Sequence, residues 1–271
     1  MLIYFLIALL VLYLLLILPR FSKRKETKAF LTTPFAHRGL HDKEKGIPEN
    51  SLAAFKRAVD HGYGMELDLH LSKDGKVFVM HDDSLLRTCG VDKQLSELDS
   101  SELFEYRLEN TEEKIPLFSE VLDLVDGKSP LLIEVKPSGK NNGALCEAIM
   151  DLLSGYHGAY MIESFDPRVL IWFRKNAPNI IRGQLSQDFS KSEQKMGFLG
   201  FVLTNLFLNI ASAPDFIAYH FESRKAFTFN LVRYLYRTPV FFWTIRSKKD
   251  QEKVQVLGLG YIFENYLPNN H

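Results

Sequence analysis

The amino-acid sequence predicts a protein of the α/β class, a (β/α)8 barrel with one N-terminal transmembrane helix. Two observations predict the barrel. Short, β-rich apolar runs alternate with longer amphipathic stretches from residue 34 onward, which is typical of parallel strands covered by helices. Polar residues also stand at the carboxyl ends of several of these runs, and in a barrel those ends meet at one mouth where the active site is built. The transmembrane helix is predicted from an unbroken apolar run, Leu2 to Leu18.

This apolar run favours an uncleaved membrane anchor. A helix of 17 residues spans about 26 Å, at the short end of what crosses a hydrocarbon core. A cleaved signal peptide is the alternative, but no Lys or Arg precedes the run and no small-residue cleavage pattern follows it. A basic cluster begins at Arg20, directly after Pro19, and the positive-inside rule then places the rest of the chain in the cytoplasm. We therefore expect a single-pass protein of the cell membrane.

The chain divides into three expected parts: an anchor over residues 1–19, a basic juxtamembrane linker over 20–33 and a barrel domain over 34–271. The formal net charge is zero, which argues against nucleic acid as a partner. The two cysteines, Cys89 and Cys146, have no metal-type spacing and are interpreted as ordinary reduced thiols.

Nine runs are candidate strands, one more than the barrel needs, and we expect either Val77–His81 or Tyr261–Glu264 to lie outside the barrel wall. The first expected helix has a plausible N-cap in Asn50 or Ser51 and ends before Gly62. The candidate strands are Phe35–His37, Met65–His70, Val77–His81, Leu131–Lys136, Tyr160–Phe165, Ile180–Leu185, Phe216–His220, Val240–Ile245 and Tyr261–Glu264. The expected helices include Ser51–His61, Ser119–Val125, Gly143–Leu153, Pro167–Asn176 and Lys248–Leu257.

Two segments interrupt the alternation. Asp83–Lys114 is charged and lacks apolar periodicity, so we expect a surface excursion of loops and a short helix. Phe198–Ala213 is nearly all apolar but too short and too polar for a second membrane span. It is either a buried barrel helix or an interfacial segment resting on the bilayer, and it has more bulky residues than one face of a barrel helix usually needs.

Three carboxylates in apolar strands predict a metal site. Glu66 and Asp68 are two residues apart, so their side chains share one strand face, where they repel each other unless a cation neutralises them. Glu134 lies in the second apolar run, where a buried charge must be paired or bind a metal. Three carboxylate ligands favour one hard divalent cation, Mg²⁺ or Ca²⁺, over zinc.

The other polar residues at strand ends fit the cleavage of a phosphodiester. That reaction needs an acid, a base and positive charge on the non-bridging oxygens. His37 and His81 are the candidate acid and base, and which is which stays open. Arg38 and Lys136 are the candidate phosphate ligands, although Lys136 could instead simply pair with Glu134.

Further residues have less specific roles. His41 and His70 could compete with the two histidines, and His70 could be a secondary ligand or a substrate contact. Glu49 either completes the metal shell through water or supports its loop. Trp243 is predicted to form an apolar wall against the substrate, with a core tryptophan as the alternative.

These motifs resemble those of the glycerophosphodiester phosphodiesterase family. The resemblance extends from Phe35 to Pro268. It implies a (β/α)8 barrel that uses a divalent cation to hydrolyse glycerophosphodiesters to sn-glycerol 3-phosphate and an alcohol, in phospholipid and glycerol metabolism. It also implies Glu66, Asp68 and Glu134 as metal ligands, His37 and His81 as the acid/base pair, and Arg38 and Lys136 on the phosphate. The motifs that carry it include His37-Arg38-Gly39, Pro48-Glu49-Asn50-Ser51, Glu66-Leu67-Asp68, His81-Asp82, Glu134-Val135-Lys136, Ser164-Phe165 and Trp243-Thr244.

Two departures from the family pattern lie near the C-terminus. Ile245-Arg246 follows Trp-Thr where members usually have a small residue and an asparagine, and Glu264-Asn265 stands where Thr-Asp is common. Neither removes a proposed ligand or histidine, so we expect them to affect substrate preference more than catalysis. Arg246 either contacts an anionic head group or caps or pairs at the surface.

Two alternatives to this function remain. The first is a lysophospholipase D-like or lipid-anchored glycerophosphate hydrolase, because the anchor and Phe198–Ala213 would hold the mouth near lipid. The second is a membrane-tethered binding protein with a decayed catalytic barrel, which the retention of all the core polar residues argues against. The expected partners are a small-molecule glycerophosphodiester or lysolipid, and membrane lipid through the N-terminal helix and Phe198–Ala213.

Overall fold

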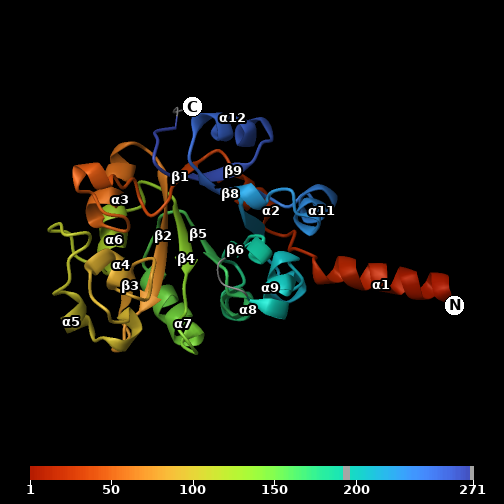
Figure 1. Ribbon diagram of the computed structural model, residues 1–271, viewed down its shortest axis with the longest axis horizontal. Coiled ribbons are helices and arrows are strands. Elements are labelled where there is room, and N and C mark those ends of the chain that lie inside the picture. Colours follow the sequence, from red (N-terminus) through yellow and green to blue (C-terminus); the bar gives the residue numbers. More distant parts are fainter. Residues whose placement is uncertain (192–195, 269–271) are drawn as a thin grey trace.

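The computed structural model describes residues 1–191 and 196–268, which form an α/β barrel (Figure 1). Within them eight parallel strands follow one another in the order β1-β9-β8-β7-β6-β5-β4-β2, and β1 pairs with β2 to close the ring. The predicted barrel is therefore confirmed. Its strands are β1 (Pro34–Ala36), β2 (Gly64–Leu71), β4 (Leu131–Val135), β5 (Tyr160–Ser164), β6 (Arg182–Ser186), β7 (Phe216–His220), β8 (Val240–Ile245) and β9 (Gly260–Phe263).

The ninth strand, β3 (Val77–Val79), lies outside the barrel wall. It pairs antiparallel with β2, with Val79 opposite Leu69, and only residues 72–76 separate the two strands. A parallel pairing needs a crossover of a dozen or more residues, so this short connection permits only a hairpin. Of the two strands expected to be extra, β3 is the one outside the ring, and β9 is a full stave.

Helices cover the outside of the barrel. Helix α3 begins after Ser51, whose Oγ accepts a hydrogen bond from the Ala54 N–H at 3.1 Å, as the predicted N-cap requires. Apolar side chains of the helices pack on the outward faces of the strands, and together they form the largest buried cluster. The main covering helices are α3 (Leu52–Asp60), α6 (Phe118–Val125), α7 (Asn142–Leu153), α8 (Pro167–Asn176), α11 (Phe227–Leu235) and α12 (Lys248–Val256).

A second buried cluster fills the inside of the barrel, with Phe35, Leu132, Phe216, Phe241 and Ile262 among its members. Side chains alternate between the two faces of a strand. On β2 and β4, the inward-facing residues beyond this cluster, toward the carboxyl ends of the strands, are acidic. The inner apolar cluster therefore lies beneath a polar mouth.

Residues 83–114 form an excursion with its own small core. The segment contains α4 (Leu86–Cys89), a 3₁₀ turn at Leu95–Glu97 and α5 (Ser100–Leu103). Apolar residues spaced along it pack together and on Phe78 of the hairpin. The segment is therefore more ordered than the loops and single short helix expected.

Helix α1 (Leu2–Leu16) projects from the barrel, as Figure 1 shows, and none of its residues is buried. It has 15 residues, and among residues 1–191 and 196–268 no helix combines the length and apolar character needed to cross a membrane. The transmembrane segment predicted for residues 1–19 is therefore not supported.

The end of α1 is attached to the barrel, which explains why the helix is shorter than the apolar run. Ile17 is fully buried, and its carbonyl accepts a hydrogen bond from the Asn209 side chain at 3.2 Å. Arg20 forms an ion pair with the buried Asp215. The following helix, α2 (Arg24–Lys28), contacts the barrel through a bond from Arg24 to the Tyr236 carbonyl. The basic cluster is thus partly engaged by the protein itself.

The apolar segment Phe198–Ala213 forms α9 (Gly197–Thr204) and α10 (Asn209–Ser212). Gly200 is the one buried residue of α9, while Phe198, Leu199 and Phe201 are each more than half exposed. The interpretation of this segment as a buried barrel helix is therefore wrong for α9.

Candidate active site

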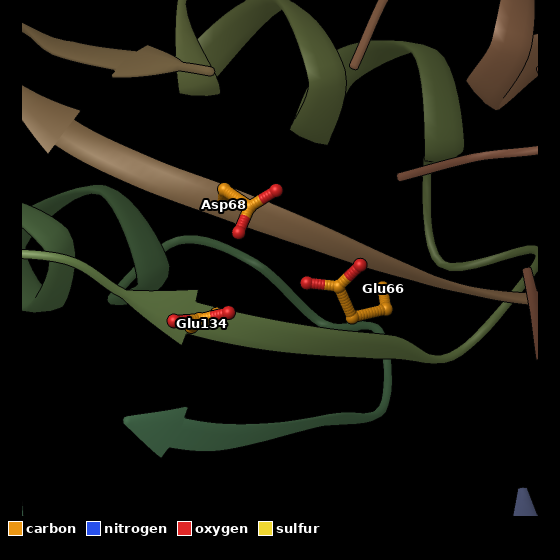
Figure 2. A group of neighbouring side chains, drawn as sticks. All are labelled: Glu66, Asp68 and Glu134. Atoms are coloured by element: carbon orange, nitrogen blue, oxygen red, sulfur yellow. The ribbon is translucent and has the colours of Figure 1, made fainter. Parts of the chain in front are cut away.

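A buried carboxylate trio stands at the mouth of the barrel. Glu66 and Asp68 come from β2 and Glu134 from β4, and Figure 2 shows the three side chains converging between the two strands. One carboxylate oxygen from each lies within 4.8 Å of those of the other two. Asp68 is opposite Glu134 in the register of the sheet, so the barrel itself brings the two acids together, as the sequence predicted.

Two cationic side chains and an amide surround the trio. The backbone N–H of Arg38 donates to Glu66 Oε2 at 2.9 Å. Lys136 Nζ lies 2.9 Å from Glu134 Oε1 and 3.3 Å from Asp68 Oδ1. The Asn50 amide donates to the other Asp68 oxygen at 2.8 Å. The predicted pair between Lys136 and Glu134 is therefore present, and Lys136 contacts Asp68 as well.

Electrostatics within the trio are unequal. Burial, reinforced by the neighbouring carboxylates, raises the pKa of Glu66 well above its usual value. Burial also raises the pKa of Glu134. At Asp68 burial acts in the same direction, but Lys136, His81 and Arg38 hold its pKa well below the usual range. Two buried acids that resist ionisation beside an ionised third fit a site for a divalent cation, because a cation would stabilise all three charges.

His37 is held at the mouth by Glu264. The residue directly follows β1, and its Nδ1 lies 3.0 Å from Glu264 Oε1, just after β9. Burial alone would raise the pKa of Glu264, but hydrogen bonds from His37 and His41 lower it strongly, so the carboxylate is ionised. An ionised carboxylate only accepts hydrogen bonds, so His37 carries its proton on Nδ1 and presents Nε2 as a lone pair.

His81 has an equivalent arrangement with Asp82. Its Nδ1 lies 2.6 Å from Asp82 Oδ1, and the hydrogen bond from His81 is the main reason why the pKa of Asp82 is lowered. The sequence predicted His81 at the mouth for the wrong reason, because β3 is not a parallel stave. Strand β2 extends beyond the mouth, and β3 returns antiparallel to bring His81 back beside the acids.

The chain reverses direction directly after β1. Arg38 and Gly39 have positive φ angles of 55° and 78°, and a Cβ on Gly39 would lie 2.9 Å from that of Ala54. Only glycine fits this approach. The reversal points the Arg38 guanidinium at Glu49, with Nη1 at 2.9 Å from Oε1, and Arg87 holds the same carboxylate from the other side. Glu49 thus orients Arg38 and stands outside the trio.

The remaining predicted residues have clear positions. His70 is buried and donates from Nε2 to the His81 carbonyl at 3.1 Å, so it supports the return of the hairpin. His41 lies 3.4 Å from Glu264. Trp243 on β8 lines the mouth. Arg246 pairs with Glu264 at 2.8 Å, so the two departures from the family pattern contact each other.

Three residues at the mouth were missed as site residues in the sequence. Glu163 on β5 is opposite Glu134 and almost fully buried, and burial raises its pKa well above the usual value. An acid within an apolar strand was the signal, the same one that identified Glu134. Glu264 could not be found that way, because its role depends on contact with His37, 227 positions away. Phe165 adds an aromatic wall.

The candidate residues share one cavity of about 130 Å³. Lys136 adjoins it through its contact with Glu134, and Asp68 through its contact with Lys136. One side of the cavity is polar and the other apolar. Its lining includes His37, Arg38, Glu66, His81, Glu134, Glu163, Phe165, Leu185 and Trp243.

A buried acidic trio, two carboxylate-oriented histidines and two cationic groups at the mouth of a barrel fit metal-assisted chemistry on a phosphate ester. The chain belongs to the glycerophosphoryl diester phosphodiesterase family, whose model matches residues 37–266.

Relatives and solved structures agree with this family. A lysophospholipase D of Rattus norvegicus is 33% identical over 157 residues, covering 53% of this chain and 48% of the relative. The chain spans about half the length of the mammalian relatives of this kind that it matches. A glycerophosphodiester phosphodiesterase of Caldanaerobacter subterraneus is 29% identical over 248 residues, which are 84% of this chain and 91% of the relative.

Among solved structures, an Oleispira antarctica phosphodiesterase in complex with the product sn-glycerol-3-phosphate has a TM-score of 0.70 at 23% identity, covering 88% of this chain and 94% of that one. The Thermotoga maritima glycerophosphodiester phosphodiesterase has a TM-score of 0.64 at 25% identity, covering 84% and 92%. At 23% identity, the similarity to the Oleispira antarctica structure concerns the fold alone.

Proposed function

We propose that this protein hydrolyses glycerophosphodiesters to sn-glycerol 3-phosphate and an alcohol, with one divalent cation, Mg²⁺ or Ca²⁺, held by Glu66, Asp68 and Glu134. The observation that carries the proposal is the convergence of this trio with His37 and His81 on one cavity. Folding alone does not require three buried carboxylates together, since each costs free energy unless it is compensated. When bound, the cation supplies Lewis acidity to a phosphoryl oxygen and positive charge among the acids.

His37 is proposed as the base. Burial lowers its pKa below the ordinary value of 6.5, against the raising effect of Glu264, so the ring is neutral near pH 7. Its Nδ1–H donates to Glu264, which leaves Nε2 free to take the proton of the nucleophile. Glu264 also stabilises the ring once it is charged, because the two groups then form an ion pair.

His81 is proposed as the acid that protonates the departing alkoxide. Asp82 fixes the orientation of its ring through Nδ1, which leaves Nε2 as the nitrogen that would donate the proton. Arg38 and Lys136 stand on either side of the acids, where they would hold the non-bridging oxygens of the phosphate. Trp243 would pack against the glycerol as an apolar wall.

Product release tests this function directly. Glycerol 3-phosphate released from glycerophosphocholine and glycerophosphoglycerol would be measured with Mg²⁺, Ca²⁺ or chelator. We expect release that depends on a divalent cation and is lost in His37→Ala, while Glu252→Gln, a change at an exposed acid on α12, retains it. Release that is indifferent to chelator, or that survives His37→Ala, would contradict the proposal.

We also propose that the protein resides at the cell membrane with the barrel on the cytoplasmic side, attached through α1 and α9. Both helices expose apolar side chains. Rings of Tyr13, Phe207 and Phe201 contact one another in sequence, at centroid distances of 5.7 and 5.8 Å, and so connect the two helices. An exposed apolar surface of this kind is typical of attachment to a lipid interface.

Vesicle binding and a topology reporter test this location. The full chain should co-sediment with phosphatidylglycerol vesicles, and Phe198→Ser with Phe201→Ser should weaken that binding. A reporter fused after residue 271 should be active only in the cytoplasm. Equal sedimentation of the wild type with and without vesicles, or a reporter active outside the cell, would contradict the proposal.

A further inference from the structure

An apolar groove of about 610 Å³ lies beside the candidate active site, outside the barrel mouth. It runs between the start of α8, the 3₁₀ turn Phe189–Lys191 and α9. None of the roles described above uses it. Its apolar lining residues are Phe165, Pro167, Phe189, Met196, Leu199 and Leu203.

The groove borders the catalytic cavity at one residue. Phe165 lines both spaces. Its ring contacts Trp243 in the cavity at a centroid distance of 5.6 Å and Phe189 in the groove at 6.1 Å. Three aromatic rings therefore lie in a row from the catalytic cavity to the groove. A molecule bound in the cavity would reach the groove by passing over the Phe165 ring.

The charge of the groove selects for an uncharged occupant. Its two ionic residues, Asp166 and Arg168, are paired with each other at 2.6 Å, and Asp166 also caps the N-terminus of α8. The remaining polar group among the lining residues is the amide of Gln187. No uncompensated charge faces the groove in the described part of the chain, so an ionic or strongly polar ligand would lose its hydration there without gaining a partner.

The outer wall of the groove is a helix that lacks an apolar partner. A helix that is apolar all round is normally buried, yet in α9 Leu199 is 51% exposed and Phe198 is 80% exposed. Apolar surface of this kind usually marks a binding site. Leu199 faces the groove, so a ligand lying there would cover part of the exposed surface.

We propose that this groove binds the acyl chain of a lysophospholipid, whose phosphodiester occupies the catalytic cavity. This inference rests on the proposed function and names the substrate class. The occupant follows from the path through Phe165, since a chain that reaches the groove from the cavity must be attached to the glycerophosphodiester itself. An ester-linked acyl chain on the glycerol meets both requirements: it is attached to the glycerophosphodiester, and it is uncharged.

The overall reaction is the same diester hydrolysis. The oxygen of water forms a bond to phosphorus, the phosphorus–oxygen bond to the head-group alcohol breaks, and that alcohol leaves with a proton. The second product is an acylglycerol phosphate. The acyl ester is untouched, and the reaction needs neither oxidant nor further co-reactant.

Choline release from a series of short-chain lysophosphatidylcholines tests the groove. The full-length protein would be assayed below the micelle concentration of each substrate, with glycerophosphocholine as the chain-free reference. Each methylene that enters the groove should raise kcat/KM about fourfold, until the groove is full. Leu199→Glu should reduce the ratio of kcat/KM for the decanoyl substrate to that for glycerophosphocholine at least about tenfold.

The matched control is Leu257→Glu, which introduces the same charge at a leucine of the same exposure, 50%, after α12. This variant should retain the wild-type ratio. Met196→Gln provides a second groove variant with a smaller change in volume and should reduce the ratio in the same direction.

Each outcome separates the two proposals. If glycerophosphocholine is cleaved in a cation-dependent way but kcat/KM for the lysophosphatidylcholines does not depend on chain length, the groove proposal is wrong and the proposed phosphodiesterase activity is retained. A chain-length preference that Leu199→Glu and Met196→Gln leave intact, or one that appears only above the micelle concentration, would also overturn the groove. Failure to cleave any diester would overturn the proposed function itself.

Discussion

The two sides of the barrel mouth differ in chemistry. Strands β1, β2 and β4, with the β3 hairpin, position the acidic trio, both histidines and both cationic groups. Strands β5, β6 and β8 contribute Phe165, Leu185 and Trp243, which form an apolar wall. Glu163 and the Arg246–Glu264 pair are the charged exceptions on the later strands.

This difference separates two tasks. The first side holds the groups proposed to act on the phosphorus, which is the same in every glycerophosphodiester. The second side would contact the groups attached to the phosphate, and Phe165 on this side also lines the apolar groove. We therefore expect substitutions on the first side to lower turnover of all glycerophosphodiesters alike, and substitutions on the second side to change which of them are preferred.

The largest effect is expected for Asp68→Asn on the acidic side. Loss of the one carboxylate that is held ionised should lower kcat by on the order of 10³-fold, because charge stabilisation by a bound cation is worth several kcal/mol. Glycerol 3-phosphate release would be measured across a titration of Mg²⁺ and Ca²⁺. Asp151→Asn, at an exposed acid on α7, is the control. A near wild-type kcat in Asp68→Asn would show that Asp68 is not a cation ligand.

His81→Ala should lower kcat about 10²-fold or more for substrates with poor leaving groups, since a positioned general acid contributes on that scale. The loss should be much smaller for a p-nitrophenyl phosphodiester, because its leaving group needs no proton. Rates on the two substrates would be compared in wild type and variant. An equal loss on both would show that His81 does not act as the acid.

Glu264 is one of the charged residues on the otherwise apolar second side. Glu264→Gln should therefore alter the rate and its pH dependence, and not the substrate preference. The Glu264 carboxylate raises the pKa of His37 while burial lowers it. Removing the carboxylate should therefore lower that pKa further, move the acid limb of the kcat/KM profile to lower pH and reduce kcat about tenfold. The pH profiles of both proteins would be recorded. A limb that stays in place or moves to higher pH contradicts this role for Glu264.

Trp243→Leu should have the smallest effect. Its ring lies in the apolar wall and contacts Phe165, so the variant should raise KM a few-fold, as expected for about 1 kcal/mol of lost packing, with little change in kcat. Steady-state kinetics on glycerophosphocholine would separate the two constants. A fall in kcat with unchanged KM would place Trp243 among the catalytic groups.

The contrast between the two sides of the mouth also explains how much of the site could be predicted from the sequence. On the first side the decisive residues lie in short motifs, and strand geometry alone predicted that Glu66, Asp68 and Glu134 would converge. The barrel followed from alternation. The hairpin at β3 was not assigned, although the short connection over residues 72–76 already excluded a parallel pairing with β2. The pairing of Glu264 with His37 was missed, because it joins the first and last staves.

At the N-terminus, too, tertiary contacts explain the difference between the sequence prediction and the structure. Composition alone predicted a membrane span, but the end of the apolar run is buried against the barrel: Ile17 is fully buried and Tyr13 bonds Thr228 at 2.8 Å. Packing of this kind is tertiary and leaves no local signature. The apolar character of α9 was evident in the sequence, whereas its position beside the mouth was not.

Calorimetric titration of the full-length protein with Mg²⁺ and with Ca²⁺ is the most direct test of the acidic trio. The account predicts one binding site for at least one of the two cations in the wild type. It also predicts that Glu66→Gln abolishes that site while leaving the thermal unfolding midpoint within a few degrees of the wild type, since a neutral amide of similar shape replaces a buried acid that resists ionisation without the cation. Binding of equal affinity and stoichiometry in Glu66→Gln would contradict the assignment of the trio as the cation site.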